Sequence, residues 1–362
     1  MKYQYHELLS FTQNIFNAIG CPKKDATIAA TALISADLRG VDSHGIARLI
    51  GYTRLYEKDR INVTPDIRII HETPSTATVD GDAGLGLVVG QKSMHIALEK
   101  AKKVGTGWVA VKDSNHFGIA GYHSMMALKE DCIGIALTNA SPLVSPTFAN
   151  DRLLGTNPIS VAIPAGKEEP FIADMATTTA ANGKLEILQR KNEPAPSGWV
   201  QDEDGLPTKD AFGVKNGGAL LPLGGDRVHG SHKGYALGAI VDILSAVLSG
   251  ANYGPWAPPF VSFLDLPSDP VGDGLGHFFG AMRIDAFRSK LEFKEHMDNW
   301  LRRFRNARPS PDQMEVLVPG DPERRVERIR KEFGIPILDS VVEDLKRLAE
   351  KYQVPLPIAD PE

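Results

Sequence analysis

The fold prediction starts from the stretch Asp113-Ser114-Asn115-His116-Phe117-Gly118-Ile119-Ala120-Gly121-Tyr122. Residues 107–112 before it favour β-structure and predict a buried strand, so the stretch would form a glycine-bounded turn at the strand end. Turns at strand ends often carry functional groups. His116 could accept a hydroxyl proton near neutral pH, with Ser114 and Asn115 orienting its ring or a carbonyl beside it. In the alternative, Ser114 and Asn115 only cap the turn and the backbone satisfies His116.

Composition is that of a globular protein large enough for two domains or one elaborate domain. The 362 residues are 42% hydrophobic and 23% charged. Forty basic against 45 acidic residues give a net charge of −5, so no nucleic-acid partner is expected. The two cysteines, Cys21 and Cys132, are too few for a disulfide framework and suit a reducing compartment.

The N-terminus lacks the basic and apolar regions of a secretory signal, and no run of about 18 apolar residues predicts a membrane span. We therefore expect a cytoplasmic protein without a membrane partner. No metal site is expected.

Residues 24–55 have a helical pattern that glycines interrupt within residues 39–45. Asp42 or Ser43 would cap the helix that follows. His44 and Arg48, four residues apart, would converge on one small anion near the helix N-terminus. The alternative is a surface histidine and a solvated arginine.

Residues 81–90 contain glycines that invite comparison with a dinucleotide-binding loop. Gly84, Gly86 and Gly90 leave three residues between the second and third glycine, whereas the fingerprint requires two. We interpret these glycines as turn and close-packing positions.

Further strands are predicted at residues 132–141, 158–164, 171–176 and 276–284. Lys233 precedes an apolar helix, residues 236–248, that we expect to be buried. This lysine is a candidate phosphate contact or, alternatively, a helix-end cation that reaches solvent.

The C-terminal tail is predicted to be helical, and its helices should pack with those of the N-terminus. The expected division is a helical domain of residues 1–75 plus 286–362 and an α/β domain of residues 76–285.

Seven motifs, in order along nearly the whole chain, make it similar to the malate/L-lactate dehydrogenase family of the sulfolactate dehydrogenase type. They are Val41-Asp42-Ser43-His44-Gly45 with Arg48, Ser114-Asn115-His116-Phe117-Gly118, Gly155-Thr156-Asn157-Pro158, Asp174-Met175-Ala176, Gly183-Lys184, His232-Lys233-Gly234-Tyr235 and Val318-Pro319-Gly320-Asp321-Pro322-Glu323. The resemblance implies an α/β, mixed-sheet, non-Rossmann NAD(P)-binding fold. It also implies a homodimer that uses NAD, with NADP possible.

The same resemblance implies roles for individual residues. His116 and His44 are the acid/base candidates, Ser43 supports His44, and Arg48 and Thr156 hold the substrate carboxylate. The residues implied to line the cofactor site are Asp174, Met175, Ala176, Lys233, Gly234, Gly320 and Asp321. Any carboxylate relay after Gly183 would fall to Glu186.

The predicted function is an NAD(P)-dependent oxidoreductase that interconverts a small 2-hydroxy acid and its 2-oxo acid. Malate/oxaloacetate and lactate/pyruvate are the leading pairs. The alternatives are a reductase of 2,3-diketogulonate or a cyclic imino acid, and a nucleotide-binding protein without catalysis. That last alternative needs neither His44 nor His116, so the presence of both favours the enzyme. The sequence leaves open the substrate and the choice between NAD and NADP.

Overall fold

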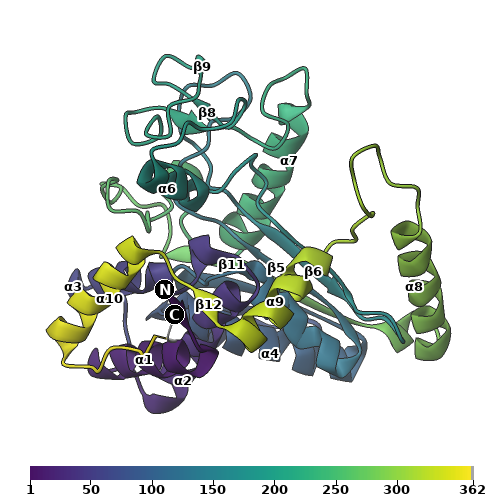
Figure 1. Cartoon of the computed structure of the whole chain (residues 1–362). Coiled ribbons are helices and arrows are strands. Elements are labelled where there is room, and N and C mark those ends of the chain that lie inside the picture. The colour runs from purple at the N-terminus through teal and green to yellow at the C-terminus, as the bar shows by residue number, and fades with distance from the viewer. Residues whose placement is uncertain (360–362) are drawn as a thin grey trace.

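A seven-stranded mixed sheet forms the centre of the computed structural model, which describes residues 1–359 (Figure 1). The pair β3–β4 is parallel, and the other neighbouring strands are antiparallel. The predicted mixed sheet is therefore confirmed, because a Rossmann sheet is mostly parallel. In spatial order the strands are β2 (Arg68–Glu72), β3 (Thr76–Gly84), β4 (Thr106–Ser114), β11 (Leu275–Arg283), β5 (Cys132–Thr138), β6 (Ile159–Ile163) and β7 (Phe171–Met175).

Helix α4 (Gly86–Val104) provides the crossover between the parallel strands β3 and β4. Its apolar face and alternate residues of the strands form one core, which includes Val79, Val109 and Phe279. A Cβ at Gly86 would overlap the carbonyl oxygen of Asn115, so the start of α4 lies directly against the backbone beside His116. The predicted close-packing function of this glycine segment is confirmed.

A helical layer joins the two chain ends, whose purple and yellow segments lie side by side in Figure 1. It contains α1 (Tyr5–Ala18), α2 (Lys23–Leu38), α3 (Leu49–Glu57), α9 (Asp321–Phe333) and α10 (Asp339–Tyr352). Short strands β1 (Lys2–Tyr3) and β12 (Ile335–Pro336) pair beside them. Most of the expected contact between the chain ends is thus present.

Helix α8 (Lys290–Arg305) departs from this expectation. It lies apart from the N-terminal helices, at the far right of Figure 1, and the backbone of residues 166–168 bonds to Asp298 on it. The prediction that all tail helices join the N-terminal ones is therefore wrong for α8. The domain division at residues 75 and 286 stays a proposal.

A second lobe covers one end of the sheet. Its elements are α6 (Asn182–Lys191), β8 (Val200–Gln201), β9 (Pro207–Thr208), β10 (Ala219–Leu220) and α7 (Ser231–Asp242), which continues as a π-helical turn (Ile243–Val247). Short 3₁₀ turns lie at Gly254–Trp256 and Ile284–Ala286. None of the helices within residues 1–359 has the length and apolar character needed to cross a membrane.

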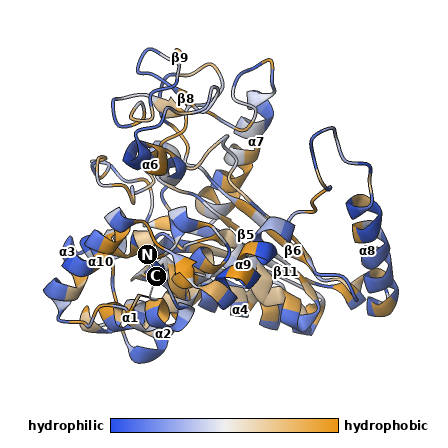
Figure 2. Cartoon of the chain, in the orientation of Figure 1, coloured by the Kyte–Doolittle hydropathy of each residue, from blue (hydrophilic) through white to orange (hydrophobic). Residues whose placement is uncertain are grey.

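The expected burial of α7 is wrong for one of its faces. Ile240, Ile243 and Val247 follow one another at helical spacing and are 51%, 53% and 49% exposed. Figure 2 shows apolar colouring along this helix, whereas α8 is mostly hydrophilic. The apolar composition of this helix predicts burial, but an apolar helix face can also remain uncovered in a single subunit.

Candidate active site

His116 lies in the turn between the end of β4 and helix α5 (Ala120–Met125), as predicted. Its two neighbours do not orient its ring. The Ser114 hydroxyl lies 2.7 Å from Nε2 of His277, and the Asn115 amide donates to the carbonyl of Ala83 at 2.8 Å. The predicted orientation of the ring by these two residues is therefore wrong, because Ser114 contacts His277 and Asn115 binds backbone carbonyls of neighbouring segments.

The partner of the His116 ring is Tyr52 of α3. The Tyr52 hydroxyl lies 2.6 Å from Nδ1 of His116, and the ring of Phe260 packs at 4.6 Å between centroids. Tyr52 is fully buried. In the sequence, Tyr52 lies in the second part of the helical pattern of residues 24–55, among apolar residues. A buried tyrosine, however, needs a polar partner for its hydroxyl, and this was the available signal.

His44 and Arg48 come from two successive 3₁₀ turns, η1 (Asp42–His44) and η2 (Ile46–Arg48), before α3. Neither Asp42 nor Ser43 caps the following helix. The Asp37 carboxylate accepts the Ile46 N–H at 2.6 Å and holds the segment instead. The predicted cap is therefore wrong, although the convergence of His44 and Arg48 is present.

The two candidate histidines face each other, with stacked rings whose centroids are 5.7 Å apart. The Ser43 hydroxyl lies 2.9 Å from Nδ1 of His44, in position to support it. Burial, with the Arg48 charge adding to it, lowers the pKa of His44 to about 3. Burial, with His44 and Arg48 adding to it, also holds the pKa of His116 well below its ordinary value. Both rings are therefore neutral at neutral pH and can accept a proton.

Both rings line a small cavity of about 60 Å³. Its wall also contains Arg48, whose Nη2 forms a 2.9 Å ion pair with Glu186 of α6. A Cβ at Gly183 would lie 2.6 Å from the same nitrogen, so the glycine allows α6 to approach. Glu186 contacts Arg48 and Asn182 rather than a histidine, and the suggested carboxylate relay is not formed.

A second cavity of about 530 Å³ adjoins the small one. His44, Thr156 and Ala181 line both cavities. A volume of this size lies within the range of pockets that bind cofactors.

Asp174, Met175 and Ala176, which are candidates for cofactor binding, line this second cavity at the end of β7. The side chain of Asp174 is exposed to the cavity, and protein atoms surround it on the other sides. This burial raises the pKa of Asp174 to about 6, although the Gly121 N–H and Arg39 act to lower it. The Gly121 N–H donates to the Asp174 carboxylate at 2.9 Å, so one acceptor oxygen is held in place. This set of groups suits the hydroxyls of a nucleotide.

Four predicted cofactor residues lie outside this cavity wall. Lys233 is exposed on the first turn of α7, and Gly234 packs against the backbone of Leu223, which does line the cavity. Gly320 lies behind Ile172 of the wall.

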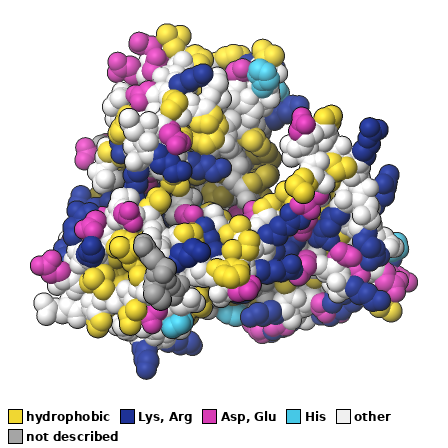
Figure 3. All heavy atoms as spheres, viewed as in Figure 1, with side chains coloured by type: hydrophobic (Ala, Val, Ile, Leu, Met, Phe, Trp, Pro, Cys, Tyr) yellow, Lys and Arg dark blue, Asp and Glu magenta, His cyan; other side chains and the backbone are white. Residues whose placement is uncertain are grey.

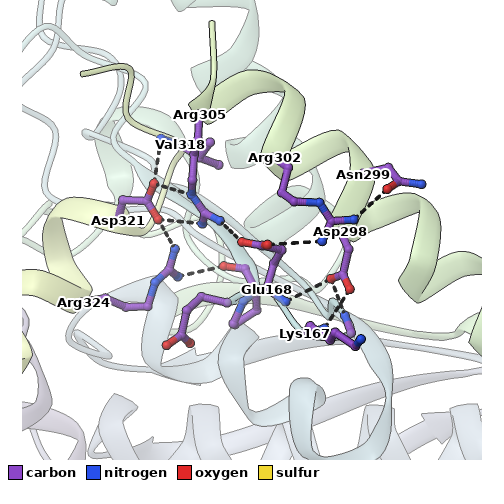
Figure 4. A network of polar contacts seen from close by, with 12 residues as sticks. Lys167, Glu168, Asp298, Asn299, Arg302, Arg305, Val318, Asp321 and Arg324 are labelled. Carbon is purple, nitrogen blue, oxygen red and sulfur yellow. Dashed lines mark hydrogen bonds and ion pairs between the residues drawn. The ribbon is translucent and has the colours of Figure 1, made fainter. Parts of the chain in front are cut away.

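Asp321 is turned away from the cavity. Its carboxylate pairs with Arg305 at 2.9 Å and with Arg324 at 2.6 Å, in the network that ties α8 to α9 (Figure 4). Lys184 and Glu323 also line the cavity, and neither is among the cofactor residues predicted from the sequence.

A further cavity, of about 800 Å³, is lined by residues of η1 and α6. Ser43 and Arg48 reach it, but neither candidate histidine lines it. Figure 3 shows the surface hollowed between the lobe that carries α6 and the helices below. Because acid/base chemistry needs the histidines, we assign the chemistry to the two smaller, adjoining cavities.

The chain matches the family model described as malate/L-lactate dehydrogenase over residues 3–346. It is 44% identical to a malate dehydrogenase of Pyrococcus abyssi, with 96% of this chain and 94% of the relative covered. Identity to the L-sulfolactate dehydrogenase of Methanocaldococcus jannaschii is 38%, with 93% of each chain covered.

Solved structures agree with these sequence comparisons. The malate dehydrogenase of Pyrococcus horikoshii OT3 has a TM-score of 0.89 at 40% identity, covering 98% of this chain and 96% of that one. Malate dehydrogenase from Entamoeba histolytica has a TM-score of 0.92 at 36% identity and 99% coverage of both chains. The predicted resemblance, mixed-sheet fold and 2-hydroxy acid oxidoreductase activity are thus confirmed, and the family implies a nicotinamide cofactor. The chain belongs to the malate/L-lactate dehydrogenase family.

Proposed function

We propose that this oxidoreductase interconverts malate and oxaloacetate with NAD, and that His116 is the acid/base. The observation that carries the proposal is the junction of the two cavities at His44 and Thr156. An acid bound in the small cavity, against the two histidines, would lie next to a cofactor in the cavity of about 530 Å³, as direct hydride transfer requires.

Side chains that line the small cavity have separate roles in the proposed reaction. Arg48 binds the carboxylate next to the reacting carbon, with Thr156 beside it, since a guanidinium can make a two-point contact. The neutral His116 takes the proton of the C2 hydroxyl through Nε2, and His44, held by Ser43, donates to the same oxygen. A bound nicotinamide would supply the hydride acceptor.

A cationic chamber beside the histidines favours malate over lactate. We give this name to the cavity of about 270 Å³ whose charged wall residues are Arg48, Arg54, Arg190, Lys215 and Glu186. It shares Arg48, Phe260 and Val261 with the small cavity. A substrate with a second anionic group can therefore extend into it.

Arg54 is the residue of the cationic chamber that we expect to bind the second anionic group. Its guanidinium donates to the carbonyl oxygen of Phe260, and within residues 1–359 no carboxylate lies in ion-pair distance of it. Burial and the Arg48 charge lower the pKa of Arg54, so the two cations repel one another. An anion between them removes this repulsion. A methyl group, as in lactate, gains nothing there, and neither does the uncharged remainder of diketogulonate or of a cyclic imino acid.

NAD is the proposed cofactor because Asp174 and Glu323 line the cavity of about 530 Å³. Carboxylates accept hydrogen bonds from ribose hydroxyls and repel the 2′-phosphate of NADP. Lys184 in the same wall could approach the pyrophosphate. Lys233, Gly234, Gly320 and Asp321 stay candidates only if the wall rearranges around the cofactor.

A homodimer is proposed as the functional state. The exposed stripe of Ile240, Ile243 and Val247 on α7 supports it, since an uncovered apolar helix face favours association. Ile240→Glu should shift the sedimentation coefficient toward that of a monomer. We also propose a cytoplasmic enzyme, because its two cysteines are free.

The test is steady-state oxidation of NADH and NADPH with oxaloacetate, pyruvate, sulfopyruvate, diketogulonate and piperideine carboxylate. We expect the highest kcat/KM for oxaloacetate with NADH. Equal or higher kcat/KM for pyruvate would exclude the cationic chamber as a specificity site, and turnover of none of the 2-oxo acids would exclude the proposed reaction.

A further inference from the structure

The Tyr52 hydroxyl contacts two different polar atoms of His116. It lies 2.6 Å from Nδ1 of the ring and 3.3 Å from the carbonyl oxygen of the same residue. The Gly118 N–H also points at Nδ1, at the long distance of 3.4 Å. The contact at 2.6 Å is therefore the strong one, and the carbonyl offers the hydroxyl proton a second acceptor.

These distances decide which ring nitrogen can carry the proton. If the hydroxyl donates to Nδ1, the proton of the neutral ring stays on Nε2. If the hydroxyl donates to the His116 carbonyl instead, its oxygen can accept an N–H from Nδ1, and Nε2 keeps a lone pair. A hydroxyl can serve both arrangements because it is at once donor and acceptor. The Gly118 N–H can only donate and favours the first.

Only the second arrangement supports the proposed chemistry. To oxidise a hydroxy acid, His116 must accept a proton on the nitrogen that faces the substrate. Nδ1 faces Tyr52, so this nitrogen is Nε2, for which residues 1–359 supply no hydrogen-bond partner. The substrate-facing lone pair therefore requires that the ring proton be on Nδ1.

We propose that the Tyr52 hydroxyl is the positioning group that holds a proton on Nδ1 of His116, so that Nε2 can exchange a proton with the substrate. The inference depends on the proposed acid/base role of His116. It gives Tyr52 the task that a carboxylate performs beside the histidine of a hydrolytic triad, but without a charge.

The proton balance follows from this arrangement. During oxidation the substrate O–H bond breaks and an N–H bond forms at Nε2, while the N–H at Nδ1 remains donated to Tyr52. The resulting imidazolium releases the Nε2 proton through the cavity after the product leaves. Burial raises the pKa of the Tyr52 phenol, so Tyr52 keeps its own proton, donates it to the His116 carbonyl and accepts the hydrogen bond from Nδ1.

Packing fixes the phenol independently of the hydrogen bond. The Tyr52 ring meets Phe16 at 6.1 Å and Phe260 at 5.2 Å, both edge to face. Phenylalanine at position 52 would keep these contacts and remove the oxygen alone. Nδ1 would then face only the Gly118 N–H, and the ring would keep its proton on Nε2, in the form that cannot act as a base.

The experiment compares Tyr52→Phe with the wild-type enzyme. We expect kcat for hydroxy-acid oxidation to fall by about 100-fold, within the range for general acid–base catalysis, while KM changes by less than about 3-fold. The pH limb of kcat should also move to lower pH. The charged or titratable groups that face the His116 ring, namely His44, Arg48 and His277, are unchanged in this variant.

A second readout does not depend on activity. In protein labelled with ¹⁵N-histidine, with the His116 signals assigned by their loss in His116→Asn, we expect Nδ1 to be protonated in the wild type and unprotonated in Tyr52→Phe. An unchanged tautomer, or a kcat within about 3-fold of wild type, would overturn the assignment. A lower kcat with an unchanged tautomer and pH limb would show a packing effect only and would also overturn it.

Tyr122→Phe is the matched control, because the Tyr122 hydroxyl donates an equally short bond of 2.6 Å to Gln91, outside the site. It should leave kcat and the His116 tautomer unchanged. His116→Asn separates the two proposals. If that variant retains kcat, the acid/base role of His116 fails, whereas the nitrogen spectra still report whether Tyr52 sets its tautomer.

Discussion

Arg48 and Glu186 form an ion pair, with Nη2 2.9 Å from Oε2, at the boundary between the small cavity and the cationic chamber. The two residues are 138 positions apart and belong to different lobes. Nε of Arg48 also donates to the Ser43 carbonyl at 2.6 Å. The guanidinium is thus fixed before substrate arrives, and its remaining N–H groups can bind a carboxylate.

Arg48→Lys should therefore raise KM for the 2-oxo acid strongly. Lysine keeps the charge but cannot bind Ser43, Glu186 and the substrate at once. Loss of a charge-assisted contact costs about 1.5–3 kcal/mol, or about 10- to 150-fold in KM. Initial rates at varied substrate give KM, and Arg303→Lys on α8 is the control. An unchanged KM would remove Arg48 from the substrate site.

The two histidines should separate kinetically. His116→Asn should reduce kcat by about 10²- to 10⁴-fold and abolish the pH dependence of the base. His44→Asn should raise KM as well as lower kcat, because His44 adjoins Arg48 and lines both cavities. Profiles of kcat and kcat/KM against pH decide the roles. Loss of the profile in His44→Asn alone would make His44 the base.

Arg54→Met should alter substrate choice. We expect KM for oxaloacetate and sulfopyruvate to rise by about 10-fold or more, since a charged hydrogen bond is lost, while KM for pyruvate changes little. Pyruvate serves as the internal control, as it places no anion in the cationic chamber. Equal increases for all three acids would mean that Arg54 supports the site structurally.

Cofactor binding can be tested with the two lysines, Lys184 and Lys233. Lys184 lines the cavity of about 530 Å³ that we propose for the cofactor, and Lys233 does not. Lys184→Met should therefore weaken NADH binding more than Lys233→Met. Titration by NADH fluorescence measures both dissociation constants, with circular dichroism as the check on folding. A larger loss in Lys233→Met would indicate that the first turn of α7 closes over the cofactor.

Stability should fall as the solution is acidified. Burial lowers the pKa of His123 to about 4 and of His277 to about 3. Between about pH 6.5 and 4 the unfolded chain therefore binds protons that the folded chain does not, so unfolding becomes easier as pH falls.

Each such histidine contributes about 1.4 kcal/mol per pH unit in that window. His277→Gln should reduce the slope of unfolding free energy against pH by about that amount, measured by urea titration from pH 7 to pH 5. His6→Gln, at an exposed position on α1, is the control. An unchanged slope in His277→Gln would show that His277 has the same pKa in the folded and the unfolded chain.

The sequence by itself determined most strands of the sheet, though not β2, together with the failure of the dinucleotide fingerprint and the proximity of His44 to Arg48. These features depend on residues close together along the chain, where the period of apolar residues and the position of glycine restrict the backbone. The family could also be identified, because its motifs recur in order along the chain.

Only the tertiary structure brought Tyr52 to His116, 64 residues away, and Glu186 to Arg48. Only the tertiary structure, too, shows that α8 lies apart from the other C-terminal helices and that one face of α7 is uncovered. The local sequence pattern predicts that a side chain is buried. It does not predict which distant segment of the chain packs against it. The partner is chosen when the sheet, the helical layer and the second lobe pack together, and at that step the chemistry of the site is assembled.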